Sequence, residues 1–207
     1  MKEDILEQLV DDYLQSEGYF TRHNIKFRPR SDHHDFDPKK DSNHSDIDVI
    51  GLHPNKIGPD RVWVVNCKSW QSGFRVQSKL AELVENKIIS GRESWHSFRE
   101  LMKPKWSEAF INSVEAATGT REFTYVLTVT AIIGDRRLWE SYPPFIKAMG
   151  GNPIRMIELS EMLDHFQKVS TTTVASSDIG RVLQLMRAAQ KGKKELLKAV
   201  EFQNKTS

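Results

Sequence analysis

The run from Arg61 to Lys68 limits the possible folds more than any other part of the chain. Its sequence, RVWVVNCK, is mostly apolar and rich in β-branched residues, which is typical of a buried strand. A shorter alternating pattern, IDVIG, occupies residues 47–51. The segment between them, from His53 to Asp60, contains two prolines, an asparagine and a glycine. The sequence therefore predicts two paired strands joined as a hairpin.

The remaining pattern alternates between helices and strands. Apolar residues at helical spacing predict a first helix over about 3–17, and a short strand is expected over 19–28, before a long polar loop over 28–45. Further along we expect helices over about 76–90, 94–102, 106–117 (with Pro104 as an interruption), 144–149 and 160–169 (with Ser160 as its N-cap), strands over 123–133 and 154–158, a linker over 170–177, and a last helix from about 178. This order predicts an α/β sandwich around a mixed sheet.

Length and composition place the chain in a broad class. Its 207 residues fit one domain, which we expect over 1–170 with a helical insertion at about 92–120, followed by a linker and C-terminal helix over 171–207. The net charge is +2, so any contact with DNA must come from a local patch. No apolar run is long enough to cross a bilayer, and the single cysteine, Cys67, cannot form an internal disulfide. We therefore expect a cytoplasmic protein that does not enter membranes.

The two predicted strands each carry a charged residue where apolar residues dominate. Asp48 lies inside the first strand and Lys68 ends the second. Because burying an isolated charge is costly, each of these side chains needs a partner. A carboxylate and an ammonium group held together could bracket a divalent cation and a phosphate. The carboxylate would bind Mg²⁺, and the lysine would support the attacking water or the developing charge.

Together with the segment VVNCKSW at 64–70, Asp48 resembles the PD-(D/E)XK (restriction-endonuclease-like) nuclease superfamily, and within it the Mrr-like and Holliday-resolvase-like branch. The resemblance covers residues 3–90. It implies a restriction-endonuclease-like α/β/α sandwich with a central mixed sheet and a C-terminal helix. It also implies a Mg²⁺-dependent DNA endonuclease that hydrolyses phosphodiester bonds, for which Mn²⁺ may substitute. By analogy with such nucleases, a homodimer is a further expectation.

The resemblance also assigns roles to individual residues. Asp48 matches the metal-binding aspartate, with Asp46 as an alternative on the same strand. Lys68 matches the catalytic lysine, and the carbonyl of Cys67 completes the metal coordination. Glu7 matches the helix glutamate that assists metal or water binding, and Glu3, one turn earlier, is the alternative.

Asn66 departs from this pattern, because the superfamily usually carries Asp or Glu there. An amide oxygen can ligate Mg²⁺, but it brings no negative charge, so the affinity for metal should fall. In one group of restriction enzymes the acidic residue has moved to the following helix, with thirteen residues between it and the lysine. Glu82 has that separation from Lys68, and Glu85 lies on nearly the same helix face. The remaining position of the predicted centre, beside Asp48, Lys68 and Glu7, is therefore predicted to be filled by Asn66 or by Glu82.

Several alternatives remain open at this point. Asp48 and Lys68 could form a plain cross-strand ion pair, and Glu7 could belong to a solvated acidic helix face. The fold could be a catalytically impaired DNA-binding module, or a regulatory or structural partner subunit that uses the insertion at 92–120 as its interface. In the polar loop, His33, His34 and His44 suggest a transition-metal site, although their spacing favours a solvated loop instead.

Overall fold

The computed structural model describes residues 4–169, 180–182, 184–186, 188 and 189. The chain divides into two compact units, Met1–Ser160 and Glu161–Ser207. The expected linker at 170–177 lies outside the described residues. Of the expected last helix, positions 180–182, 184–186, 188 and 189 are helical. The predicted domain boundary at 170 stays a prediction. The described helices include none that is both long and apolar enough to span a membrane.

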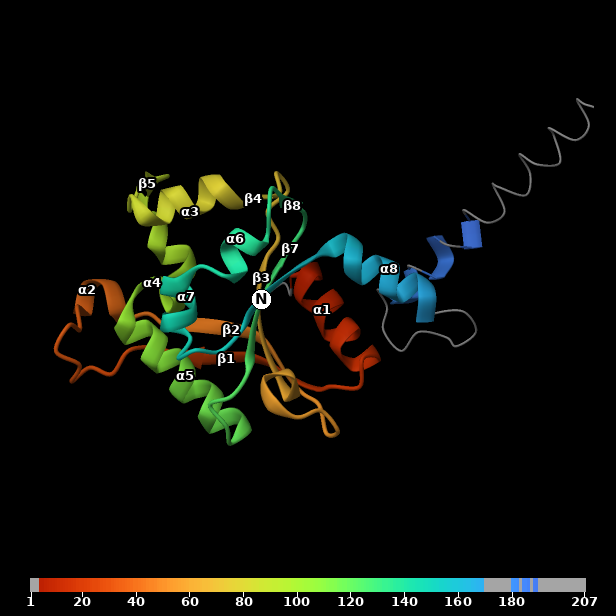
Figure 1. The fold of residues 1–207 in the computed structure, drawn as a ribbon, viewed down its shortest axis with the longest axis horizontal. Coiled ribbons are helices and arrows are strands. Elements are labelled where there is room, and N and C mark those ends of the chain that lie inside the picture. Colours follow the sequence, from red (N-terminus) through yellow and green to blue (C-terminus); the bar gives the residue numbers. More distant parts are fainter. Residues whose placement is uncertain (1–3, 170–179, 183, 187, 190–207) are drawn as a thin grey trace, which may run out of the picture. The chain divides into compact units, whose positions relative to one another are not determined.

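A mixed five-stranded sheet organises the first unit (Figure 1). Its strands stand in the order β1 (Phe20–Phe27), β2 (Ser45–Leu52), β3 (Val62–Lys68), β7 (Thr124–Val129) and β9 (Ile154–Glu158). The first three pair in antiparallel fashion, whereas β3, β7 and β9 run parallel. The predicted hairpin and mixed sheet are therefore confirmed. Because β3 stands at the centre, every residue in it except Lys68 is buried.

One face of the sheet is covered by α1 (Ile5–Ser16), which contacts β1, β2 and β3. The helix begins at Asp4, whose carboxylate caps it by accepting the N–H of Leu6. Its buried side chains are Leu6, Leu9, Val10 and Leu14. The helix approaches the sheet closely at Gly51, where a Cβ atom would lie 3.1 Å from the Tyr19 ring and 3.3 Å from Leu14. A glycine at position 51 therefore allows the close packing of α1 on β2.

The helices α4 (Arg99–Met102), α5 (Pro104–Thr118) and α7 (Pro143–Ala148) lie on the other side of the sheet in Figure 1. The core between these helices and the sheet is dominated by aromatic side chains that are fully or almost fully buried: Phe74, Phe98, Trp106, Phe110, Phe123, Tyr125, Trp139 and Phe145. Each large apolar side chain buried in this way contributes roughly 1.5–3 kcal/mol to folding. The insertion expected at 92–120 thus forms part of the core.

Smaller elements complete the unit. They are α2 (Pro38–Asp41), the 3₁₀ helices η1 (Gly58–Arg61) and η2 (Ser94–Phe98), α3 (Val76–Val84), α6 (Arg137–Glu140), the parallel pair β4 (Phe74–Arg75) and β8 (Ile132–Ile133), and the antiparallel pair β5 (Ile88–Ile89) and β6 (Arg92–Glu93). The helix α8 (Leu159–Val169) follows β9 directly.

Some element boundaries differ from the expectations. The helix expected to reach 90 ends at Val84, because Asn86 adopts a positive φ of 49° and the chain turns into β5. The strand expected to reach 133 ends at Val129, and the next extended residues join β8. Pro104 begins α5, as a proline at the first helical position can, and does not interrupt a helix there. Ser160 lies inside α8, so its expected role as the N-cap is wrong.

Candidate metal and catalytic centre

The side chain of Asp48 lies where β2 and β3 stop pairing. The ladder between these strands runs from Leu52–Val62 to Val49–Val65. One residue further on, the Asp48 carboxylate accepts the backbone N–H of Cys67 at 2.5 Å, measured from Oδ2 to N. A side-chain oxygen thus replaces the backbone carbonyl that a regular ladder would supply. The carboxylate is thereby fixed against the end of β3, beside Asn66 and Cys67.

The electrostatic surroundings of Asp48 include two of the predicted site residues, Cys67 and Lys68. Burial raises the pKa of its carboxyl above the usual range, while the Cys67 N–H and the charge of Lys68 act in the opposite direction. Two further carboxylates, Glu100 and Asp46, raise this pKa as well. The charges of Asp48 and Lys68 are therefore close enough to interact. The Lys68 ammonium also lies 5.9 Å from the centre of the Phe98 ring.

Glu7 reaches the same electrostatic environment from α1. The pKa of its carboxyl is raised to about 6, first by burial and then by the negative charges of Asp48 and Asp4, while His23 and Lys68 partly offset this rise. Glu7 is thus influenced by both Asp48 and Lys68, and its predicted role in metal or water binding stays a prediction. The alternative, Glu3, lies outside the described residues.

Asn66 is buried, with 4% of its surface exposed, and its amide group is only half used. The Nδ2 atom donates to Glu100 Oε1 at 2.8 Å and to the Tyr125 hydroxyl at 3.3 Å. Within the described part of the chain, no donor reaches Oδ1. A buried carbonyl oxygen without a partner costs about 1–3 kcal/mol, so it requires an explanation such as a bound ion or water.

Glu100, at the second position of α4, is a site residue that the sequence reasoning missed. It is 3% exposed, and its Oε1 accepts the Tyr125 hydroxyl at 2.6 Å as well as the Asn66 amide. A signal was present, because Glu100 stands between the apolar residues Phe98 and Leu101, which are both buried. Treating this stretch as an inserted surface helix hid the buried carboxylate.

The other two candidates are placed differently. Cys67 is buried, and burial together with the negative charge of Asp48 raises the pKa of its thiol well above the usual value, so the thiol is a poor metal ligand at neutral pH. Its predicted ligand is the carbonyl, which stays a prediction. Glu82 forms an ion pair with Lys79 and lines a cavity of about 490 Å³. The walls of this cavity include Trp70, Arg75, Arg92 and Arg99.

The oxygen atoms available as ligands fit a hard cation such as Mg²⁺. Carboxylate and amide oxygens are its preferred protein ligands, and the centre offers the Asp48 carboxylate and the unpartnered Asn66 Oδ1. A nearby lysine would balance charge and contact an anionic substrate. The alternative of a plain ion pair receives less support, since the salt bridges among the described residues include no direct contact between Asp48 and Lys68.

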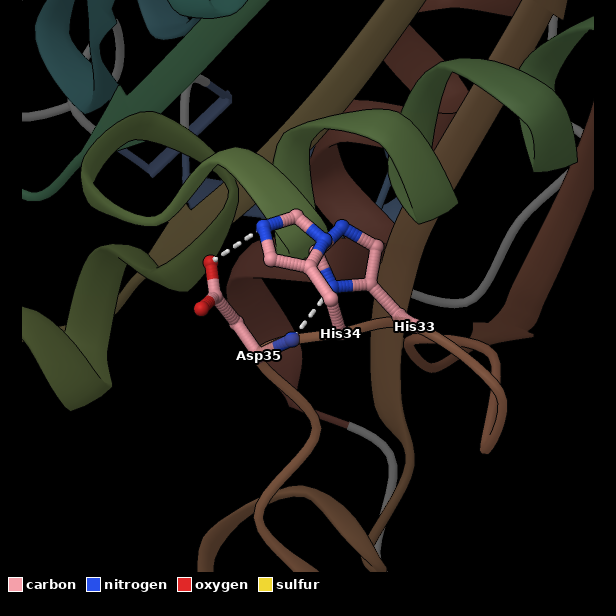
Figure 2. Close-up of side chains that lie close together, drawn as sticks. All are labelled: His33, His34 and Asp35. Atoms are coloured by element: carbon pink, nitrogen blue, oxygen red, sulfur yellow. Dashed lines mark hydrogen bonds and ion pairs between the residues drawn. The ribbon is translucent and has the colours of Figure 1, made fainter.

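A second group of metal-type ligands lies in the loop before α2. Ligand atoms of His33, His34 and Asp35 all fall within 4.8 Å of one another, and the described residues contain no other group of three or more His, Cys, Asp or Glu of this kind (Figure 2). The imidazole rings of the two histidines stack at 4.4 Å. His33 Nδ1 already accepts the Asp35 N–H, and His34 and Asp35 are exposed.

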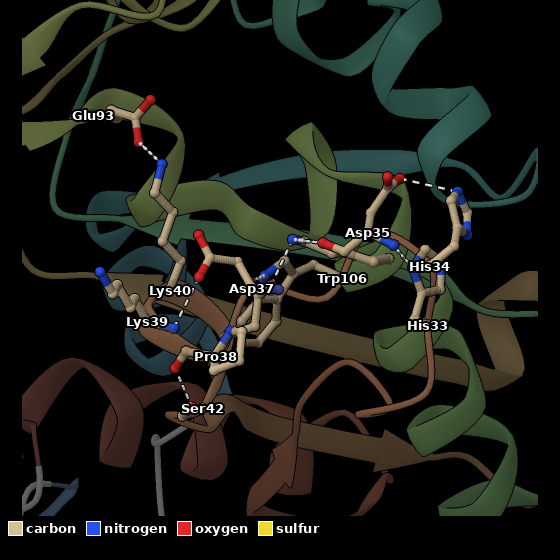
Figure 3. A network of polar contacts seen from close by, with 12 residues as sticks. His33, His34, Asp35, Asp37, Pro38, Lys39, Lys40, Ser42, Glu93 and Trp106 are labelled. Atoms are coloured by element: carbon tan, nitrogen blue, oxygen red, sulfur yellow. Dashed lines mark hydrogen bonds and ion pairs between the residues drawn. The ribbon is translucent and has the colours of Figure 1, made fainter.

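This loop is attached to α5 rather than free in solvent (Figure 3). Asp41, which is fully buried, accepts the Trp106 indole N–H at 3.0 Å and forms an ion pair with Lys105. Lys105 also donates to the carbonyl of Asp35, and Lys40 pairs with Glu93. The expectation of a solvated loop is therefore correct for His34 and Asp35, whereas the base of the loop is buried.

Comparison with known proteins adds nothing to this geometry: no family model, no curated protein and no solved structure matches the chain.

Proposed function

We propose that this chain is a metal-dependent phosphodiesterase that cleaves DNA. One observation carries the proposal. At the end of the β2–β3 ladder, the Asp48 carboxylate is held against the backbone of Cys67, and its charge interacts with those of Lys68 and Glu7. The fold around it, a mixed sheet with helices on both faces, is compatible with a restriction-endonuclease-like sandwich.

The roles follow from the chemistry of each group. Asp48 and the Oδ1 of Asn66 would hold a Mg²⁺ ion, which when bound supplies Lewis-acid activation of the phosphate and a more acidic water. Lys68 would donate a hydrogen bond to the scissile phosphate and offset its developing negative charge. With a pKa of about 6, Glu7 is ionised at neutral pH and could accept the proton of the attacking water.

A basic cavity supports DNA as the substrate. Four cationic side chains line it against the two carboxylates of Glu82 and Glu93, and Trp70 contributes an aromatic wall; the cations are Arg75, Lys79, Arg92 and Arg99. The chain connects this cavity to the centre at two points, since Trp70 follows Lys68 by two residues and Arg99 directly precedes Glu100. Arginine and lysine side chains in such a groove would bind successive phosphates of the backbone, whatever the base sequence.

The second candidate is a DNA-binding module without cleavage activity. It is favoured by the hydrogen bonds from Asn66 and Tyr125 to Glu100. These bonds hold Asn66, the residue that departs from the superfamily pattern, in a buried network. Such a network can exist for stability alone. This candidate and the nuclease share the basic cavity but differ in their need for a cation.

The test is cleavage of supercoiled plasmid by the full chain in Mg²⁺ or in EDTA, alongside an electrophoretic shift assay. We expect cleavage only with the metal, its loss in Asp48→Asn, and no change in Lys39→Ala, which removes an exposed lysine elsewhere. A DNA shift without cleavage by the wild type would instead support the binding module. A steep dependence of linearisation, but not of nicking, on protein concentration would support the proposed homodimer.

A further inference from the structure

Glu100 contacts Asn66, the residue of the candidate centre that lacks a negative charge. The superfamily that the chain resembles usually carries an acidic residue at position 66, and Asn66 fills that position with a neutral amide. The amide nitrogen of Asn66 lies 2.8 Å from Glu100 Oε1. A carboxylate from α4 is thus brought within hydrogen-bonding distance of the residue that should have carried one.

The burial of Glu100 makes a purely structural role costly. It is 3% exposed, and the same oxygen, Oε1, accepts both the Asn66 amide and the Tyr125 hydroxyl. Asn66 directly precedes Cys67, whose backbone N–H donates to the Asp48 carboxylate, so β3 links the two acidic residues. Two interacting carboxylates in a largely buried site repel each other unless a proton or a cation is shared between them. Lys68 is the cation that acts on Asp48, and it supplies one positive charge for the pair.

Asn66 Oδ1 provides the second, independent observation. It belongs to an almost fully buried side chain, and no donor among the described residues reaches it. Because Nδ2 is fixed on Glu100 and Tyr125, the amide cannot rotate to satisfy Oδ1 without losing both hydrogen bonds. An acceptor left open on a buried side chain that already contacts a carboxylate is suited to a cation and unsuited to a further anion.

We propose that Glu100 is the acidic partner of Asp48 in the metal centre, supplied by α4 in place of the missing acid on β3. In this arrangement Asn66 orients the Glu100 carboxylate through Nδ2 and offers Oδ1 to the cation. Glu82, which the spacing from Lys68 had suggested for this role, is paired with Lys79 and takes no part. The inference rests on the proposed function and goes beyond it by assigning the negative charge to a different element.

The experiment is a calorimetric titration of the full chain with Mn²⁺, which needs no substrate and no cleavage. Glu100→Gln keeps the size of the side chain and an acceptor oxygen for Asn66 and Tyr125, and it removes only the charge. We expect Mn²⁺ to bind at least about tenfold more weakly to this variant than to the wild type. Glu82→Gln is the matched control, and we expect its affinity to equal that of the wild type.

A second variant, which moves the carboxylate from position 100 to position 66, keeps the test decisive if the single change perturbs folding. Asn66→Asp combined with Glu100→Gln returns the carboxylate to β3 and places the amide on α4, so one hydrogen bond between them can form with its direction reversed. We expect this double variant to recover Mn²⁺ affinity to within a few-fold of the wild type. Thermal melting of each variant without metal measures its folding separately.

The outcomes separate the inference from the proposed function. Mn²⁺ binding that weakens in Asp48→Asn but is unchanged in Glu100→Gln would overturn the role of Glu100 and leave the metal centre standing. Weakened binding in Glu82→Gln, with Glu100→Gln unaffected, would assign the charge to α3 instead. Failure of the wild type to bind Mn²⁺ at all would overturn the proposed function itself and, with it, the inference.

Discussion

Two regions of this molecule hold residues of the kinds that bind metals, and they differ in how their polar atoms are used. In the loop before α2, His33, His34 and Asp35 lie close together; His34 and Asp35 face solvent, His33 is half-buried, and their polar atoms can be satisfied by water or by each other. At the end of β3, Asn66 and Glu100 are buried, and one oxygen has no partner among the described residues. The first region is distinguished by the short distances between its ligand atoms. The second is distinguished by a buried carboxylate and by a buried oxygen that lacks a hydrogen-bond donor among the described residues.

This contrast teaches that burial is the better guide to a candidate centre than ligand type. A His-His-Asp sequence in which two of the three side chains are exposed costs little to maintain, because water competes for the exposed groups. A buried carboxylate beside another carboxylate costs several kcal/mol unless something compensates it. The predictions below test whether the buried region carries function and whether the exposed loop is neutral.

The largest effect is expected at Asp41, the buried base of the loop. Asp41→Ala leaves the Lys105 ammonium and the Trp106 indole N–H without their buried acceptor. Breaking one partner of a buried ion pair costs about 3–5 kcal/mol, and we expect a loss of this size in the free energy of unfolding in urea. Asp35→Ala in the same loop, where the side chain is exposed, should change it by less than about 0.5 kcal/mol. Equal effects would show that burial does not separate the two parts of the loop.

Lys68→Ala should have the next largest effect, on activity rather than stability. Removing a group that stabilises developing charge typically lowers the rate by about 10²-fold or more, and we expect that loss in plasmid cleavage with saturating Mg²⁺. The control is Lys105→Ala assayed well below its melting temperature, where cleavage should change little. Near-normal cleavage by Lys68→Ala would remove this residue from the centre.

Tyr125→Phe probes the buried network from a third strand. The change deletes the hydroxyl that donates to Glu100 at 2.6 Å and leaves the ring in the core. We expect the free energy of unfolding to fall by about 1–3 kcal/mol, because a buried carboxylate loses a donor. Tyr142→Phe, a half-buried tyrosine beside α7, is the comparison and should cost less. A neutral result at position 125 would mean that the Glu100 carboxylate does not depend on this hydroxyl.

Glu7→Gln should alter stability in a pH-dependent way. The folded protein raises the pKa of Glu7 from 4.5 to about 6, so ionisation of this carboxylate disfavours folding above that window. The wild type therefore loses stability from this group as pH rises from about 4.5 to 6. After allowance for partial exposure, we expect the glutamine variant to be about 1 kcal/mol more stable at pH 7.5 and equal to the wild type near pH 4. Urea unfolding at both pH values measures the difference, and a variant that is less stable at pH 7.5 would contradict it.

The smallest effect is expected at His34. His34→Ala should change stability by less than about 0.5 kcal/mol, and it should leave both Mn²⁺ affinity and cleavage unaltered. Its imidazole is exposed and pairs only with the neighbouring Asp35 among the described residues. A loss of Mn²⁺ binding in this variant would reverse the comparison and move the metal centre to the loop.

The sequence was sufficient to predict the sheet and part of the centre. The runs at 47–51 and 61–68 identified the hairpin because β-branched apolar patterns report burial directly, and the same runs identified Asp48 and Lys68 as unusual. Glu100 could not be found in this way, because its place beside Asn66 depends on how η2, α4 and α5 pack on the sheet. Glu82 was chosen by counting along the chain, and such a count cannot foresee that Lys79, one turn earlier, pairs with it.

The hydrogen bond from Cys67 to Asp48 makes one backbone amide a natural reporter of the centre. Where β2 and β3 separate, this N–H depends on a titratable side chain of β2 and not on a backbone carbonyl of that strand. Any event that draws the Asp48 carboxylate elsewhere or neutralises it should change the rate at which this amide exchanges its hydrogen with solvent, while Val64 and Val65 inside the ladder keep theirs. Occupancy of the centre can thus be followed by isotope exchange at a single peptide group.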